Sequence, residues 1–134
     1  MKVIDKIKLE EIKEAQKEAE RIGNLLLAEY QIAPVDIKVK DIRRGYASYT
    51  RYISIPLWAF WQGKDFFTYY IIHEVCHFIN HDRGGNYGHS GKFKEIETGV
   101  LGQWGLKPIY NRAYVKQLRG GNGQLLWDKG GFHR

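Results

Sequence analysis

Cysteine is almost absent from this chain of 134 residues, in which Cys76 is the single example. One cysteine cannot form an internal disulfide, and it excludes a zinc site built from cysteines alone. Long apolar runs are absent as well, since stretches such as residues 55–61 fall far short of the roughly 18 residues that cross a membrane as a helix. No basic, apolar and small-residue leader opens the sequence. We therefore expect a cytoplasmic protein with no membrane segment and no disulfide scaffold.

Proline is also rare, and the composition of 43% hydrophobic and 27% charged residues is typical of globular proteins. The length predicts one compact domain, residues 1–134, and no linker or internal repeat divides it. The net charge is +6, and its positive excess lies in residues 35–134, because acidic residues slightly outnumber basic ones before that point. A basic region of this kind favours acidic partners or DNA, although a surface selected for solubility explains it equally well.

Hydrophobic periodicity predicts a long N-terminal helix over about residues 5–32. Its apolar side chains recur every three or four positions, at Leu9, Ile12, Ala15, Ala19, Ile22 and Leu26. Pro34 ends this helix, because the residue before a proline resists the helical conformation. Two strands are expected next, over residues 35–40 and, after a turn near Gly45, over residues 52–55. Because both helices and strands are predicted, we expect an α+β fold.

A further helix is predicted over residues 66–80, with Asp65 as its N-cap. Glu74 is the only Asp, Glu, Lys or Arg within these residues, and apolar or aromatic side chains occur on all sides of the helix. Such a helix is expected to be buried at the centre of the fold. Polar side chains are costly in that place unless they are satisfied, which draws attention to His73, Glu74 and His77.

These three residues form the pattern His-Glu-x-x-His. On a helix, His73 and His77 are about 40° apart around the axis and about 6 Å apart along it, so both rings can face one ion. Neutral imidazole is a common zinc ligand, and Glu74 on the adjacent flank can take a proton from a water held by the metal. The pattern predicts one catalytic zinc ion with Glu74 as general base, as in zinc peptidases. The plainer alternative is a pair of core histidines that are satisfied by backbone groups or buried water.

A catalytic zinc site needs a third protein ligand and an open fourth position. His81 continues the series, but on a straight helix it lies about 9 Å along the axis from the midpoint of the first pair. Glu97 has a separation from His77 that occurs in zincins with a glutamate ligand, although the usual companion acid four residues later is missing. His89 is the preferred ligand, because the glycine pair at residues 84–85 ends the helix and turns the chain back.

A third helix is predicted directly after His89. Ser90 is a suitable N-cap, and Gly105 stands where a C-terminal glycine cap belongs. The apolar stripe of this helix comprises Phe93, Ile96, Val100 and Trp104. We expect the stripe to pack against the helix that carries the first two histidines, which would hold His89 in place.

The segments His-Glu-Val-Cys-His (73–77) and Gly-His-Ser-Gly-Lys-Phe (88–93) together resemble the SprT-like zinc metallopeptidases, over about residues 46–105. In that family a glycine-rich turn follows HExxH, and the histidine of a Gly-His-small-x-x-Phe segment is the third ligand. The resemblance implies a zincin-like fold, with a small mixed sheet, an active-site helix, a third-ligand helix and a long N-terminal helix. It also implies one zinc ion bound by His73, His77 and His89. The implied activity is hydrolysis of peptide bonds in proteins or peptides, which in some members are proteins attached to DNA.

The C-terminal part, residues 106–134, departs from this family. Many relatives continue into a zinc ribbon with two cysteine pairs, whereas no cysteine occurs here. Residues 113–118 and 124–127 flank a glycine-rich stretch, which predicts a basic β-hairpin extension. The missing ribbon weakens the expectation of DNA binding, and the positive charge keeps it open. The alternative function is a non-catalytic binding module that zinc stabilises and that associates with nucleic acid.

Overall fold

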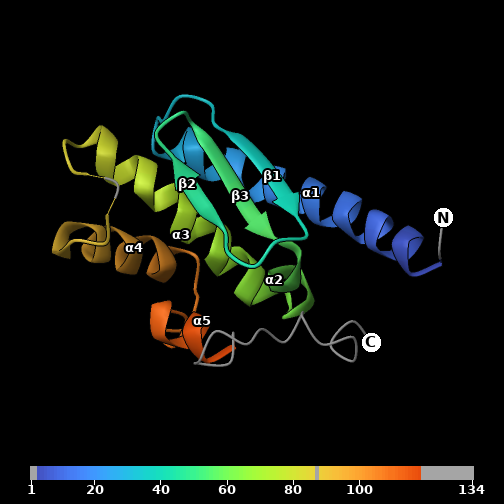
Figure 1. Ribbon diagram of the computed structural model, residues 1–134. Coiled ribbons are helices and arrows are strands. Elements are labelled where there is room, and N and C mark those ends of the chain that lie inside the picture. Colours follow the sequence, from blue (N-terminus) through green and yellow to red (C-terminus); the bar gives the residue numbers. More distant parts are fainter. Residues whose placement is uncertain (1–2, 87, 119–134) are drawn as a thin grey trace.

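The computed structural model describes residues 3–86 and 88–118, shown in Figure 1. In chain order, its elements are α1 (Val3–Glu29), β1 (Asp36–Lys40), β2 (Tyr46–Ser48), β3 (Tyr52–Pro56), α2 (Leu57–Trp61), α3 (Lys64–Asp82), α4 (Gly91–Gln103) and α5 (Arg112–Leu118). These elements form an α+β fold, as the sequence predicts. The long N-terminal helix, the two longer strands and the helices on either side of the glycine turn are all present.

The sheet has three strands in the order β1-β3-β2, with β1 parallel and β2 antiparallel to the central strand β3. The predicted small sheet is therefore confirmed, and it is mixed. Helix α1 covers the outer edge of β1, because the Gln16 side-chain amide donates to Ile37 O (2.6 Å) and accepts from Val39 N (2.7 Å). The outer edge of β2 has no strand neighbour in the part of the chain that the structure describes.

Strand β2 was not predicted, because three residues are too few to show an alternating pattern. Its position is fixed from α3, where the Tyr70 hydroxyl accepts a hydrogen bond from Gly45 N at 2.9 Å. A Cβ atom at position 45 would lie 2.6 Å from both Ser54 O and the Tyr70 ring, so the chain can pass here only as glycine. The start of β2 is thus held against the same helix that carries the His-Glu-x-x-His pattern.

Helix α1 buries most of its predicted stripe and ends at Glu29, three residues before the expected boundary. Four of the six predicted stripe positions are fully buried: Ala15, Ala19, Ile22 and Leu26. Leu9 is 43% exposed, because the first turns of α1 extend beyond the sheet (Figure 1). Gln31 has a positive φ of 56°, which turns the chain away from the helical path before Pro34.

Helix α3 crosses the centre of the molecule, between the sheet and α4 (Figure 1). Its residues 66–72 and 74–80 are all buried, which confirms the prediction of a central helix. The predicted N-cap was wrong. The N-cap position is Gly63, which has a φ of 108°, and Asp65 lies inside the first turn, where its charge favours the helix dipole. Within residues 3–86 and 88–118, no helix is both long and apolar enough to cross a membrane.

The predicted C-terminal hairpin was also wrong in its first strand, since residues 113–118 belong to helix α5. Asn111 explains the difference, because its side chain accepts a hydrogen bond from Tyr114 N (2.9 Å) as a helix N-cap does. Tyr114, Val115 and Leu118 then pack against the core at helical spacing. The expected second strand, residues 124–127, lies outside the described residues.

Candidate metal centre

His73 and His77 lie one turn apart on α3 and face the same side of the helix. Their ring centroids are 5.2 Å apart, and the rings are nearly perpendicular. The His73 side chain is 12% exposed, and His77 is 6% exposed as a residue. The regular helix therefore places both rings in a largely dry environment, where an imidazole without an ion or a hydrogen bond would be costly.

His89 reaches the same point from the segment between α3 and α4. The turn is closed by Asn80 of α3, whose carbonyl accepts from Gly85 N and whose side-chain amide donates to Asn86 O, both at 2.9 Å. Ser90 then starts α4 as its N-cap, with its hydroxyl accepting from Phe93 N at 3.4 Å. The predicted cap and the predicted return of the chain to α3 are both present.

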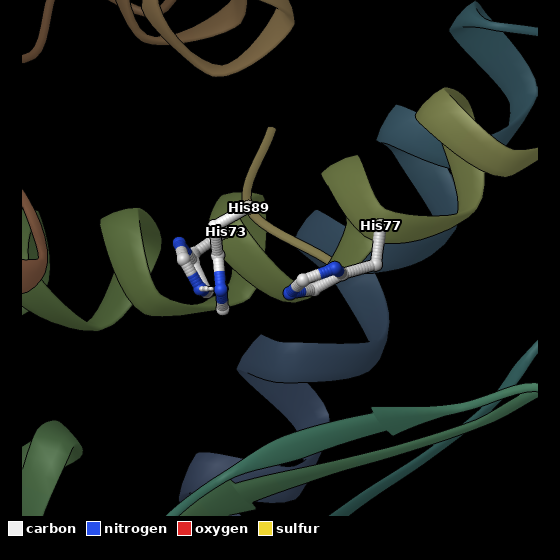
Figure 2. A group of neighbouring side chains, drawn as sticks. All are labelled: His73, His77 and His89. Atoms are coloured by element: carbon white, nitrogen blue, oxygen red, sulfur yellow. Dashed lines mark hydrogen bonds between the residues drawn. The ribbon is translucent and has the colours of Figure 1, made fainter. Parts of the chain in front are cut away.

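The three imidazoles point toward one another, two from α3 and one from the turn (Figure 2). One ligand nitrogen from each ring can be chosen so that all three lie within 4.8 Å of one another, and the Nε2 atoms of His73 and His89 are 3.1 Å apart. Ligand nitrogens on a tetrahedral zinc ion are about 3.3 Å apart, given Zn–N bonds of about 2.0–2.1 Å. The group could therefore hold a metal ion after small side-chain movements.

Phe93 forms the apolar support of this group. Its ring is fully buried and lies 5.2 Å from the His73 ring, 4.5 Å from His77 and 5.0 Å from His89, measured between centroids. One aromatic side chain of α4 thus contacts all three imidazoles. The predicted packing of α4 against α3 is correct, and it restricts the rotamers of the three histidines as well as filling the core.

Glu97 lies behind the group and not among its ligand atoms. Its Oε2 atom is 2.5 Å from Nδ1 of His73, whereas the opposite ring nitrogen of His73 faces His89. Hydrogen bonding of Nδ1 to a carboxylate leaves the Nε2 lone pair for a metal, as in the carboxylate–histidine–metal arrangement. Two other residues were considered as the third ligand. Glu97 contacts His73 instead of joining the three histidine nitrogens. His81 lies on the surface, with its Nδ1 atom 3.6 Å from Asp82 Oδ1.

Glu74 is 4% exposed and lies beside the histidines, with Oε1 3.9 Å from Nε2 of His77. Burial raises the pKa of this carboxyl to about 7; the positive charge of His73 opposes the rise and the negative charge of Glu97 adds to it. A carboxyl group with a pKa near neutrality can both accept and return a proton at physiological pH. This is the property that the proposed general base requires.

The pKa values of His89 and His73 are shifted in opposite directions. Burial, together with the positive charges of His73 and Arg112, lowers the pKa of His89 to about 4. Burial also acts to lower the pKa of His73, but the hydrogen bond with Glu97 and the negative charges of Glu74 and Glu97 together outweigh burial, so the pKa lies above its ordinary value. His89 is consequently neutral near pH 7, which is the form of imidazole that binds a metal.

A cleft of about 550 Å³ opens onto this group. Its floor is α3, with His73, Glu74 and His77, and His89 also lines it. One wall is formed by β2 and the residues before it, and the other by α5. The α5 wall was not predicted from the sequence. Arg112 and Lys116 are four residues apart, a spacing that places two side chains on the same face of a helix.

Comparison of the chain with protein-family models, with curated proteins and with solved structures finds no match to any of them. The described geometry and the sequence patterns are therefore the basis for assigning a function. The strongest single feature is the convergence of three histidines and a buried glutamate on one cleft.

Proposed function

We propose that this protein is a zinc-dependent metallopeptidase with a zincin-like fold, similar to the SprT-like family. The observation that carries the proposal is the position of Glu74, which is buried at the floor of the cleft beside three convergent histidines. Core histidines satisfied by backbone groups would have no need of this carboxylate, whose burial is unfavourable unless the site uses it.

The donor set favours zinc over the harder cations. Three neutral imidazole nitrogens suit zinc, whereas calcium and magnesium prefer oxygen ligands. Three ligands from the described residues would also leave one coordination position for water or substrate, and all three histidines line the cleft. A structural zinc site is normally closed by a fourth protein ligand, and residues 3–86 and 88–118 gather only the three histidines, which favours catalysis over a zinc-stabilised binding module.

Each residue of the site then has a role in peptide hydrolysis. His73, His77 and His89 would hold the ion, and Glu97 would fix the ring orientation of His73. A bound zinc ion supplies a Lewis acid that polarises the scissile carbonyl and acidifies the attacking water. Glu74 would accept the proton of the attacking water and return it to the nitrogen of the departing amine, for which its raised pKa is suited.

The arrangement of the elements supports the zincin-like fold. A helix with the His-Glu-x-x-His pattern packs between a small mixed sheet and a second helix, and His89 precedes that second helix. The edge strand beside the cleft is β2, whereas β3 is the central strand. An extended substrate can thus lie along β2 with its main chain hydrogen-bonded to the strand.

The first test is the zinc content of the purified protein, compared with His89→Ala and with Glu74→Gln. We expect about one zinc per chain in the wild type and in Glu74→Gln, and a depleted content in His89→Ala. Glu74→Gln should lower peptide cleavage by about 10²- to 10⁴-fold, because it removes the general base and keeps the ligands.

The matched control is His81→Ala, which removes a surface histidine from the same helix. It should leave zinc content and cleavage unchanged. Absence of bound metal after zinc has been supplied would contradict the proposal. Zinc binding without any cleavage would favour the non-catalytic module, and full activity of Glu74→Gln would show that the base is a different residue.

A further inference from the structure

Three cationic side chains line the cleft above the metal centre. Arg44 comes from the segment before β2, and Arg112 and Lys116 lie one turn apart on α5. The cations therefore occur on both walls, whereas the metal ligands come from the floor and the turn. All three residues are exposed, so their charges can meet a substrate that enters the cleft.

These cations have no counter-charge within the described residues. None of the three forms an ion pair there, unlike Lys8, which binds Asp41 at 2.9 Å. Among the residues that the structure describes, Glu74 is the only carboxylate that lines the cleft, and it is buried in the floor. A bound divalent ion would add further positive charge. A substrate segment in this cleft thus meets a positive electrostatic potential, which the low dielectric of the surrounding protein strengthens.

The walls also restrict the shape of the occupant. Gln16 satisfies the outer edge of β1, so β2 presents the available edge of the sheet, and it borders the cleft. A chain that adds to β2 runs between Arg44 on one side and the α5 cations on the other. Successive side chains of an extended strand point in opposite directions, so residues on both sides of the scissile bond come within reach of a cation.

We propose that the preferred substrates are extended protein segments with aspartate or glutamate on either side of the scissile bond. This specificity rests on the proposed peptidase function. Nucleic acid has the same sign of charge, but the cleft is poorly suited to stack bases. Of the tyrosines that line it, Tyr69 and Tyr70 are buried in the aromatic core, and only Tyr46 is substantially exposed, at 48%.

The test uses three internally quenched peptides with the same neutral core and with flanks of glutamate, glutamine or lysine. Their kcat/KM values are measured for the wild type, for Arg112→Glu/Lys116→Glu and for Lys17→Glu. Lys17 is an exposed cation on α1 that lines no described cleft, so its reversal controls for a charge change made away from the cleft. Each exposed charge pair contributes about two- to five-fold, and we expect the wild type to prefer the glutamate peptide over the lysine peptide by about tenfold or more.

The double variant should level or reverse this preference, and Lys17→Glu should keep it. Equal cleavage of all three peptides by the wild type, or a preference that the double variant retains, would overturn the proposed specificity without affecting the peptidase function. Failure to cleave any peptide would contradict the peptidase function instead.

Binding gives a second readout that does not depend on turnover. Fluorescence anisotropy of labelled glutamate- and lysine-flanked peptides is measured on Glu74→Gln, with and without the two α5 charge reversals. The glutamate peptide should bind more tightly, and the reversals should remove that difference. If a labelled single-stranded oligonucleotide displaces the peptide and binds more tightly, and the reversals abolish its binding, the cations serve nucleic acid and the proposal is wrong.

Discussion

Replacement of Glu97 by glutamine tests how the metal centre is organised. The change keeps the shape of the side chain and removes the charge that holds Nδ1 of His73 at 2.5 Å. A hydrogen bond between charged groups contributes about 1.5–3 kcal/mol, and loss of an outer partner of a metal-bound histidine typically weakens metal binding by about 10- to 100-fold. Glutamine can still accept one neutral hydrogen bond, so we expect about tenfold weaker zinc binding for Glu97→Gln and up to about 100-fold for Glu97→Ala.

The measurement is zinc affinity by competition with a chromophoric chelator at one fixed pH. Glu95→Gln is the matched control, because it removes the same charge from an exposed position on the same helix and should leave the affinity unchanged. Circular dichroism of the metal-free proteins separates a weakened site from an unfolded one.

Two results would refute this reasoning. If Glu97→Gln and Glu97→Ala both bind zinc within about twofold of the wild type, the hydrogen bond with His73 has no role in metal affinity. If Glu97→Ala abolishes zinc binding while His89→Ala retains it, Glu97 is a ligand and the third histidine is not.

Two further predictions concern stability. Phe93→Ala removes a fully buried ring that contacts all three histidines, so the free energy of unfolding in a chelator should fall by about 3–5 kcal/mol, whereas Ile109→Ala at a 52% exposed position should change it little. For Glu74, the folded pKa of about 7 is raised above the ordinary 4.5, so metal-free protein should lose about 3 kcal/mol of stability as the pH rises from 4.5 to 7. Glu74→Gln should abolish this loss and be the more stable protein at pH 8. Denaturant unfolding in the presence of a chelator measures the stability of the Phe93 and Glu74 variants. A difference in stability between wild type and Glu74→Gln that does not change with pH would contradict the prediction for Glu74.

The central part of the fold could be predicted because several independent signals coincide there. The all-round apolar pattern of α3, the glycine turn and the Ser90 cap each have a local cause, and each has the predicted consequence. The grouping of His89 with the α3 histidines followed from these local features. The role of Glu97 could not be read in the same way, because its contact with His73 depends on how α4 is rotated against α3.

The incorrect predictions have physical reasons as well. Residues 113–118 were predicted as a strand because they flank a glycine-rich stretch, but they also place apolar groups at helical spacing, and the Asn111 cap favours the helix. Asp65 is a good capping residue by type, but the chain begins the helix one residue before it, after Gly63. The position of β2 depends on the hydrogen bond between Gly45 and Tyr70 and on pairing with β3. Both contacts depend on the tertiary fold, so they could not be read from the three residues of the strand.

The hydrogen bond from Gly45 to Tyr70 has a mechanical consequence for the cleft. Tyr70 precedes His73 by less than one turn of α3, so the β2 wall and the His73 side chain are attached to the same stretch of helix. The distance between them is therefore set by the helical backbone of α3 and by this one hydrogen bond, and we expect it to change little when the cleft is filled. The opposite wall, α5, follows a connecting segment and packs on α3 through aromatic rings such as Phe66 and Tyr114. If the cleft widens or narrows around a bound molecule, we therefore expect α5 to move and the β2 wall to stay in place.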